Sequence, residues 1–360
     1  MSDPSSDILR RAYVLEATGE PLVRRDGALA APGPGDAVVE VSACGLCHTD
    51  LGYASGEVRP NHELPLVLGH EVVGTVVNAS QDPGPQALIG RQVLVPAVLP
   101  CGECAWCAAG RANACPTQRM PGNDLDGGFA SHMVVPARFL VPIDDAPANI
   151  DRRSLSVVAD AVSTAWQAVH RSGLKSEDVA LVVGAGGVGG YVSQIARAKG
   201  ATVIACDVDA GRLEGLSSWL HCGVDVTGRG PREVRREVRS ILGELDAPSV
   251  NWRVFECSGN AAGQQLAYSL LGRAATMVVV GYTFDKVELR LSNLMALDAQ
   301  AIGTWGCPPE AYPDVLRLVY DGVVRLDPFI EHRPMSAVND HLAEMSSGAL
   351  KRRVVMDPRA

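Results

Sequence analysis

Residues 179–207 constrain the fold of this chain more than any other stretch. An apolar segment, V-A-L-V-V, leads into the turn G-A-G-G-V-G at residues 184–189, and a helix-like run then extends to Gly200. Within that run, apolar residues recur at i, i+4, i+7 and i+8, which is the spacing of one helix face. A second apolar segment follows and ends in Asp207. The order predicts a strand, a tight turn, a helix and a second strand, which is the βαβ unit of a parallel sheet.

This unit has the features of a dinucleotide site. Gly184 permits the tight turn, Gly186 the approach of a pyrophosphate, and Gly189 the packing of helix on strand. The helix N-terminus favours an anion through its free N–H groups and its dipole. Asp207 stands 18 residues past Gly189, where it can hydrogen-bond the hydroxyls of an adenosine ribose. The alternative is a glycine turn in another α/β fold. The predicted cofactor-binding residues of this stretch are Gly184, Gly186, Gly187, Val188, Gly189 and Asp207.

Composition and charge narrow the class of protein. The 360 residues exceed what one ordinary core uses, so we expect two domains. With 47% hydrophobic and 20% charged residues, the chain has the composition of a globular protein. It contains no apolar run as long as the roughly 18 residues of a membrane span. The first residues have no apolar core of a signal peptide, so the cytoplasm is the expected location. A net charge of −9 argues against general nucleic-acid binding.

The pattern of predicted secondary structure changes near Asp160. Before that residue, short runs of β-branched residues alternate with turns rich in Pro and Gly, which predicts an irregular β-rich domain with long loops. From there to about residue 305, strand-like and helix-like segments alternate, which predicts parallel βαβ units. We expect a further helix at 312–320 and a last strand at 353–356.

Four cysteines on one short stretch predict a metal site. They are Cys101, Cys104, Cys107 and Cys115. Four thiolates can close a tetrahedral zinc site that leaves no position open, and such a site braces a loop that has little regular structure. The alternatives are an iron–sulfur cluster or a pair of disulfides.

A second candidate metal set is dispersed. Cys47 and His70 stand in the sequences C-H-T-D and G-H-E within the β-rich segment, and we expect them on neighbouring loops. Taken alone, a buried Cys or His is more often a core residue than a ligand. Together they could supply two ligands of a catalytic zinc.

These motifs resemble a known family in their order and spacing. G-L-C-H-T-D, L-G-H-E-V-V-G, the four-cysteine loop and G-A-G-G-V-G are similar to the zinc-dependent medium-chain alcohol dehydrogenases. The resemblance implies an α/β protein with a GroES-like β-rich catalytic domain, formed by residues 1–160 and 306–360. A Rossmann domain with a doubly wound parallel sheet would comprise residues 161–305 and bind NAD. It also implies two zinc ions per chain, one catalytic and one structural, and a dimer or tetramer joined through the last Rossmann strand, near residues 294–304.

The same resemblance assigns the ligands of the catalytic zinc. Cys47 and His70 would be ligands, and Glu71 is a neighbour that can enter the coordination sphere. Family members take a third ligand from a Cys just before the cofactor domain, and the matching position here holds Asp160. A carboxylate is a legitimate zinc ligand, harder than a thiolate, and should leave the metal more electrophilic.

The resemblance also assigns the proton path. Thr49 would be the hydroxyl that passes the alcohol proton onward, and Asp50 would support the metal ligands. Many family members end the path in a His two residues after that Asp, where this chain has Gly52. His48 either replaces it or contacts a cofactor phosphate.

Three further positions match cofactor contacts of relatives. Thr164, Gly281 and Arg353 correspond to residues that touch the cofactor, with Arg352 standing beside the last of them. No basic residue follows Asp207 immediately, so the sequence offers no obvious partner for a 2′-phosphate and favours NAD.

Several peptides resemble one branch of the family more closely. They are R-P-N-H-E-L-P at 59–65, M-P-G-N-D at 120–124, V-A-D-A-V at 158–162, F-E-C-S-G at 255–259, D-K-V-E-L-R-L-S-N-L-M at 285–295 and W-G-C-P-P-E at 305–310. Members of that branch oxidise a cyclic hydroxy-enoyl thioester of coenzyme A, of the 6-hydroxycyclohex-1-ene-1-carbonyl-CoA type, in anaerobic benzoyl-CoA-type aromatic degradation. The polyanionic substrate calls for basic residues, and the candidates are Arg24, Arg25, Arg59, Arg119, Lys286 and Arg290.

Two alternatives stand beside this hypothesis. The same scaffold could work as a zinc-assisted, NADH-dependent enone or enoyl reductase, with hydride delivered to the conjugated carbon. A non-enzymatic nucleotide-binding scaffold would keep only the structural zinc. Zinc content separates the last alternative from the other two, since a scaffold would hold one ion per chain.

Overall fold

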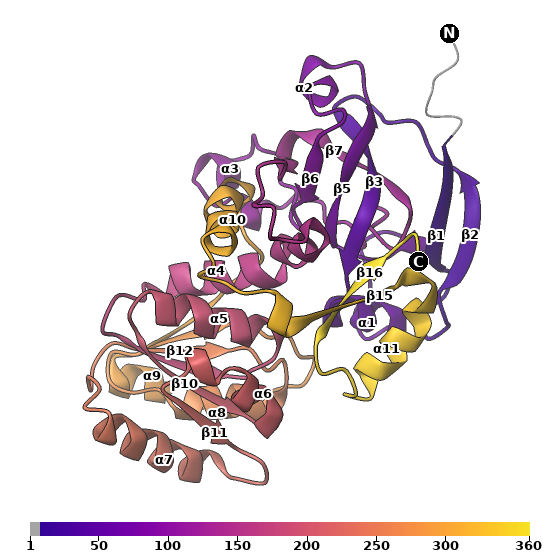
Figure 1. The fold of residues 1–360 in the computed structure, drawn as a ribbon. Helices are drawn as coiled ribbons and strands as arrows, with labels where there is room; N and C mark the ends of the chain where they lie inside the picture. Colours follow the sequence, from indigo (N-terminus) through magenta and orange to yellow (C-terminus); the bar gives the residue numbers. More distant parts are fainter. Residues whose placement is uncertain (1–7) are drawn as a thin grey trace. The chain divides into compact units, whose positions relative to one another are not determined.

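The computed structural model describes residues 8–360, which form two compact units. The first unit contains the chain up to Asp160, together with Gly306–Tyr320 and Arg325–Ala360. The second contains Ala161–Trp305 and Asp321–Val324. Figure 1 draws both units and labels their helices and strands where there is room. Among the described residues, no helix is long and apolar enough to cross a membrane.

The first unit is built on two β-sheets. The larger has seven strands, in the order β15–β16–β3–β5–β6–β8 with β7 paired to β3, and the smaller has the order β2–β1–β4. All pairings are antiparallel except that of β15 with β16. The strands are β1 (Leu9–Leu15), β2 (Val23–Ala28), β3 (Asp36–Gly45), β4 (Leu66–Val67), β5 (Glu71–Ala79), β6 (Gln92–Val95), β7 (His132–Pro136), β8 (Val141–Pro142), β15 (Ile330–Pro334) and β16 (Arg353–Asp357).

Strands β3 and β5 lie at the centre of the larger sheet and position the metal-binding residues. Successive side chains of a strand point to opposite faces, yet the consecutive residues Val38 and Val39 of β3 are both fully buried. The sheet is therefore covered on both sides. Short helices connect or flank the strands: α1 (His48–Ser55), α2 (Pro83–Gln86), α3 (Ala105–Ala108), the 3₁₀ helix η4 (Arg152–Ala159), α10 (Tyr312–Tyr320) and α11 (Val338–Ser346).

The second unit is a doubly wound parallel sheet. Its six strands have the order β11–β10–β9–β12–β13–β14, and every pair is parallel. This order places the switch point between β9 and β12, as in a Rossmann fold. The strands are β9 (Val179–Val183), β10 (Thr202–Asp207), β11 (Cys222–Asp225), β12 (Trp252–Glu256), β13 (Thr276–Val279) and β14 (Gln300–Gly303). The helices are α4 (Ala161–Ser172), α5 (Gly187–Ala198), α6 (Ala210–Gly215), α7 (Pro231–Glu244), α8 (Ala261–Ser269) and α9 (Ser292–Leu297).

The predicted fold class is confirmed, and the sequence explains the central strand. All five residues of β9 are buried, because a parallel strand covered on both faces reads as a continuous apolar run. Helix α5 contacts β9, β10 and α4, and its residues 189–196 are all buried. Two local expectations were wrong in detail. Cys47 does not lie within a loop but is the N-cap of α1, and the predicted last strand near 294–304 is divided between α9 and the short β14.

Candidate functional site

Three side chains of the first unit bring metal-binding atoms together. Cys47, His70 and Asp160 each offer one atom, and these atoms all lie within 4.8 Å of one another. The Nε2 atom of His70 lies 3.6 Å from Oδ2 of Asp160, and that oxygen lies 3.8 Å from Sγ of Cys47. His70 and Cys47 are buried, whereas the Asp160 side chain is partly exposed. The structure therefore brings together three residues that are separated widely in the sequence.

One carboxylate, that of Asp50, fixes two of these residues. Its Oδ2 accepts a hydrogen bond from the backbone N–H of Cys47 at 2.9 Å, which caps α1. Its Oδ1 accepts one from the N–H of Gly69 at 3.1 Å and lies 3.3 Å from Nδ1 of His70. His70 lies three residues after the end of β4 and directly before β5, so Asp50 ties the start of a helix to the start of a strand.

The donor set fits a zinc ion. With zinc–sulfur bonds of about 2.3 Å and zinc–nitrogen or zinc–oxygen bonds of about 2.1 Å, tetrahedral ligand atoms lie about 3.3–3.6 Å apart. The distances here are close to that range. Within the described residues, both buried ring nitrogens of His70 face carboxylate oxygens, at 3.3 Å for Asp50 and 3.6 Å for Asp160, but neither pair has the geometry of a hydrogen bond. Burial lowers the pKa of His70, but the carboxylates of Asp50 and Asp160 outweigh it and raise that pKa well above its usual value. The site thus favours a positive charge at its centre.

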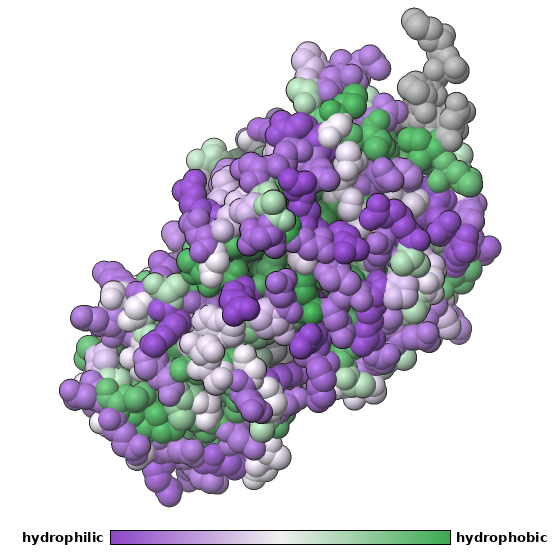
Figure 2. Space-filling model, in the orientation of Figure 1, coloured by the Kyte–Doolittle hydropathy of each residue, from purple (hydrophilic) through white to green (hydrophobic). Residues whose placement is uncertain are grey.

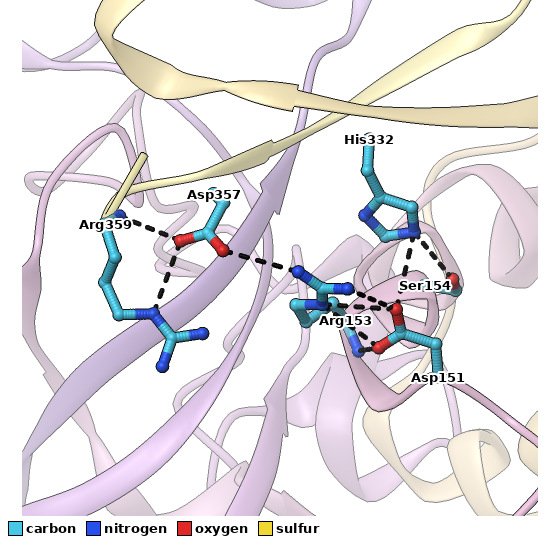
Figure 3. A network of polar contacts seen from close by, with 6 residues as sticks. All are labelled: Asp151, Arg153, Ser154, His332, Asp357 and Arg359. Atoms are coloured by element: carbon cyan, nitrogen blue, oxygen red, sulfur yellow. Dashed lines mark hydrogen bonds and ion pairs between the residues drawn. The ribbon is translucent and has the colours of Figure 1, made fainter.

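Asp160 follows η4, and the start of that helix is tied to the C-terminal strands (Figure 3). The Asp151 side chain accepts from the N–H of Arg153 at 3.0 Å, and Arg153 reaches Asp357 at the end of β16. Ser154 Oγ lies 3.1 Å from Nε2 of His332 in β15. The trio Asp151, Ser154 and His332 lacks the geometry of a catalytic triad, because the carboxylate and the hydroxyl meet the same ring nitrogen.

Glu71 and Arg353 form a buried ion pair beside the three donors. The Arg353 Nη1 lies 2.6 Å from Oε1 of Glu71, whose side chain is fully buried, and its Nη2 lies 4.0 Å from the Cys47 sulfur. Burial raises the pKa of Glu71 to about 7, although Arg353 opposes that shift. The carboxylate is thus held by a cation, outside the group formed by Cys47, His70 and Asp160. That Glu71 enters the coordination sphere, and that Arg353 touches the cofactor, stay predictions.

The residues of the predicted proton path begin helix α1. The Thr49 hydroxyl lies 3.8 Å from the Cys47 sulfur, and Thr49 is half-buried. His48 is exposed at the first position of the helix. A Cβ at Gly52 would lie 3.0 Å from Cγ2 of Val58, so the position that holds a His in many relatives is narrow here.

The four clustered cysteines converge in the same unit. Sulfur–sulfur distances of 3.5–3.7 Å link Cys104 to Cys107, Cys104 to Cys115 and Cys115 to Cys101. All ten cysteines lie in the described residues and are free thiols, so the disulfide alternative is excluded for this structure. A hydrogen bond from the backbone of Glu103, with others, lowers the pKa of Cys101 to about 6 and favours its thiolate. The set fits a closed tetrahedral zinc site.

In the second unit, the glycine turn between β9 and α5 has the shape of a phosphate cradle. Gly184 has φ +93°, and a Cβ on Gly189 would lie 1.8 Å from the carbonyl oxygen of Gly184. By contrast, the nearest atom to a Cβ on Gly186 is Nη1 of Arg212, at 3.8 Å. Two glycines are therefore required by the protein's own packing, and the space over Gly186 is open to a ligand at the N-terminus of α5.

Asp207 ends β10 and braces the same turn. Its Oδ2 accepts from the N–H of Ala185 at 2.6 Å, and its Oδ1 accepts from the N–H of Asp209 at 2.8 Å. A carboxylate has about four acceptor positions, so capacity for two ribose hydroxyls is left. Gly281 follows β13, where a Cβ would lie 2.3 Å from the N of Gly259. Thr164 lies in α4.

The chain is similar to known proteins along most of its length. The family described as alcohol dehydrogenase GroES-like domain matches residues 33–145, and the family described as zinc-binding dehydrogenase matches residues 187–321. An alcohol dehydrogenase of Geobacillus stearothermophilus is 28% identical over 329 residues, which cover 89% of this chain and 91% of the relative.

Solved structures agree with this similarity. The alcohol dehydrogenase of the hyperthermophilic archaeon Aeropyrum pernix superimposes with a TM-score of 0.85 at 26% identity, over 97% of this chain and 100% of that one. The chain belongs to the zinc-dependent medium-chain alcohol dehydrogenases. A proposed zinc-binding dehydrogenase from Sinorhizobium meliloti 1021, bound to NADP, superimposes on this dehydrogenase with a TM-score of 0.83 at 27% identity, over 98% and 100% of the two chains. The predicted family is confirmed, with zinc-dependent, NAD(P)-linked oxidoreduction as its activity.

Sequence reasoning missed two residues of the cofactor unit of this dehydrogenase. Arg212 reaches the glycine turn from α6, five residues after Asp207, and its position just after a strand is the signal that could have found it. Glu256 ends β12 and is fully buried, and its Oε1 accepts from the N–H groups of Ser258 and Gly259. An acid at the carboxyl end of an otherwise apolar strand was the available signal.

Proposed function

We propose that this dehydrogenase oxidises a cyclic hydroxy-enoyl thioester of coenzyme A to the 6-oxo enoyl-CoA, with NAD as the acceptor. The substrate would be of the 6-hydroxycyclohex-1-ene-1-carbonyl-CoA type, and the reaction would belong to anaerobic benzoyl-CoA-type aromatic degradation. The observation that carries the proposal is Asp160, which stands where relatives have a cysteine and offers its carboxylate beside Cys47 and His70. The peptides that resemble the CoA-thioester branch support it.

In this proposal, residues of the first unit have separate roles in metal binding, proton transfer and positioning. Cys47, His70 and Asp160 would hold the catalytic zinc, which when bound would supply a Lewis acid for the substrate hydroxyl. Thr49, on the first turn of α1, accepts the proton that the hydroxyl loses and passes it onward, with exposed His48 as the outlet to water. Asp50 keeps Cys47 and His70 in register. The four-cysteine loop holds the structural zinc and takes no part in the reaction.

The residues of the second unit hold the cofactor. The N-terminus of α5 and the open backbone at Gly186 bind the pyrophosphate, and Asp207 binds the ribose hydroxyls. NAD supplies the hydride acceptor. Arg212 lies near Gly186, and the S. meliloti structure holds NADP, so the choice between the two cofactors needs a direct test. We expect NAD to give at least a tenfold higher kcat/KM than NADP, because the Asp207 carboxylate repels a 2′-phosphate.

The CoA moiety calls for cations on the protein. Two of the six predicted basic residues are already engaged, since Arg24 pairs with Asp26 and Arg25 with Glu16. The other four are exposed, and they are Arg59, Arg119, Lys286 and Arg290. We propose these four as candidates for the CoA phosphates.

The test is NADH formation from a panel of CoA thioesters and simple alcohols. We expect turnover with the cyclic hydroxy-enoyl-CoA and its loss in Asp160→Ala and Cys47→Ala. Activity on simple alcohols alone would remove the CoA assignment. In the reverse direction, deuterated NADH distinguishes the reductase alternative. Label at the carbinol carbon means alcohol chemistry, and label at the β-carbon means reduction of the conjugated bond.

We also propose a homo-oligomer, joined through the second unit. Strand β14 is an edge of the six-stranded sheet, with open hydrogen-bonding groups that a second copy can pair. Leu291 and Met295, in and beside α9, are 70% and 78% exposed, and Figure 2 shows hydrophobic residues gathered around that helix. Light scattering on the purified protein gives the mass. We further propose the cytoplasm as its location, because ten free thiols suit a reducing compartment.

A further inference from the structure

The three proposed ligands of the catalytic zinc are not supported in the same way. Asp50 holds Cys47 through its backbone N–H and His70 through the ring and the preceding residue. Asp160 stands 113 residues after Cys47 and comes from another segment, at the end of η4. The position of this third ligand therefore depends on the segment that carries it.

The carbonyl group directly before Asp160 is held by a buried tyrosine. The hydroxyl of Tyr312 donates to the carbonyl oxygen of Ala159 at 2.5 Å, and the N–H of Ala97 donates to the same oxygen at 3.4 Å. Tyr312 is fully buried at the start of α10. A buried tyrosine hydroxyl needs a partner, and this one lies on the peptide group that leads into the ligand.

Fixing that carbonyl has a direct geometric effect on Asp160. The peptide bond is planar, so the position of the Ala159 oxygen determines the plane that carries the amide and Cα of Asp160. A carboxylate ligand is sensitive to this plane because it offers two oxygens and can bind through one or both. In the structure Oδ2 lies 3.6 Å from Nε2 of His70 and 3.8 Å from Sγ of Cys47.

We infer that Tyr312 is a positioning residue for the metal ligand Asp160. Its hydroxyl holds the last peptide of η4, just as the network in Figure 3 holds the first turn of that helix. The segment that carries the carboxylate is thus tied at both ends to residues from the C-terminal part of the chain. The inference rests on the proposed role of Asp160 as a ligand, and it assigns to Tyr312 no contact with substrate or cofactor.

The test removes one oxygen atom. Tyr312→Phe keeps the buried ring and deletes only the hydroxyl, so the fold should be retained. Tyr320→Phe is the matched control, because Tyr320 lies on the same helix and its buried hydroxyl has no partner among the described residues. The readout is the rate at which the holoenzyme releases zinc to a chromogenic chelator. Cys47→Ala shows which of the two zinc ions is the catalytic one.

We expect Tyr312→Phe to release the catalytic zinc about tenfold faster, the usual size of an effect on residues that orient ligands. Release of the structural zinc should be unchanged, and Tyr320→Phe should match the parent for both ions. When cobalt replaces the catalytic zinc, its visible spectrum should shift in Tyr312→Phe only. A lower melting temperature with parental zinc release and cobalt spectrum would mean a purely structural role and would overturn the inference.

A double-mutant comparison separates this inference from the proposal on which it rests. In an Asp160→Ala background, deletion of the Tyr312 hydroxyl should change zinc release by less than about twofold, because the group on which it acts is gone. An equal effect in both backgrounds contradicts positioning through Asp160. If Asp160→Ala itself leaves zinc release unchanged, Asp160 is not a ligand, and the proposed site falls together with the inference. If only Tyr312→Phe is silent, the site stands and the inference alone fails.

Discussion

The two metal sites of the first unit are assembled in opposite ways. The four cysteines stand within residues 101–115, in a stretch whose only regular structure is the four-residue helix α3 and one 3₁₀ turn. Cys47, His70 and Asp160 come from a helix N-cap, the start of a strand and the end of a 3₁₀ helix. In the first site a bound metal would have to organise the chain, whereas in the second the fold itself brings the donor atoms together.

This difference predicts how much each proposed metal ion would contribute to the stability of the fold. A loop without packing of its own depends on metal binding for its folding. The contact of this loop with Arg138 is also polar, because the guanidinium donates a hydrogen bond to the Cys101 carbonyl. The same guanidinium lies against Gly102, in the space that a Cβ would occupy. The dispersed donors sit instead on a sheet whose central strands are buried on both faces. Loss of the metal there should cost activity and leave the fold.

The largest effect should follow from breaking the local site. Cys104→Ser removes a ligand, and we expect the free energy of unfolding to fall by about 4 kcal/mol or more, because the loop loses the ion that organises it. Zinc analysis should then give one ion per chain, and thermal denaturation should show the loss. A variant that holds one zinc and melts like the parent would show that the loop is stable by itself.

Breaking the dispersed site should give the converse result. Cys47→Ala should reduce kcat/KM by at least about 10³-fold, because the Lewis acid is lost or misplaced. The melting temperature should stay within a few degrees of the parent. Kinetics and calorimetry on the same preparation provide the check. A large drop in melting temperature would contradict the view that the scaffold is preorganised.

A smaller effect should come from the support of the dispersed site. Asp50→Asn keeps the shape of the side chain, but an amide cannot accept at both positions, where Cys47 and Gly69 now donate. We expect the affinity of the catalytic site for zinc to fall by about 10–100-fold, with the structural site unchanged. Competition with a chelator of known affinity measures it. Equal loss at both sites would point to a general effect on folding.

The smallest effect concerns the far end of η4 and depends on pH. The hydrogen bond from Arg153 lowers the pKa of Asp151 below 3.8, its ordinary value. An acid whose pKa is lower in the folded state stabilises the fold at pH values above its pKa in the unfolded state. That contribution is lost as the pH falls through the pKa of the folded state. Because the pair is about 40% exposed, we expect less than about 1 kcal/mol. Urea titrations of Asp151→Asn and the parent should therefore differ at pH 6 and converge toward pH 2.

The same contrast between local and dispersed sites explains what the sequence could predict. The parallel sheet followed from a glycine turn between two apolar strands, because those signals are adjacent in the chain. The four-cysteine group followed from spacing alone. The association of Cys47 with His70 and Asp160 needed a family resemblance, since no local pattern links residues so far apart.

The remaining differences have similar physical causes. Helix α1 has only eight residues, and its mixed, weakly amphipathic sequence gives no clear helical signal. Strand β14 is short and its side chains are largely exposed, so it lacks an alternating apolar pattern. The hydrogen bond between Tyr312 and Ala159 joins residues 153 apart, and no sequence pattern around either residue predicts it.

The first unit combines N-terminal and C-terminal segments, and this affects how it folds during synthesis on the ribosome. Cys47, His70 and Asp160 are all made before Tyr312 and Arg353, whose contacts with Ala159 and Glu71 span 153 and 282 residues. At about 5–20 residues per second, Tyr312 is made roughly 8–30 s after Asp160. During that time Asp50 is present to support Cys47 and His70, but Asp160 is without the contact from Tyr312 to the preceding carbonyl. A nascent chain halted before residue 312 should therefore hold zinc at its four cysteines and only loosely, if at all, at the catalytic position.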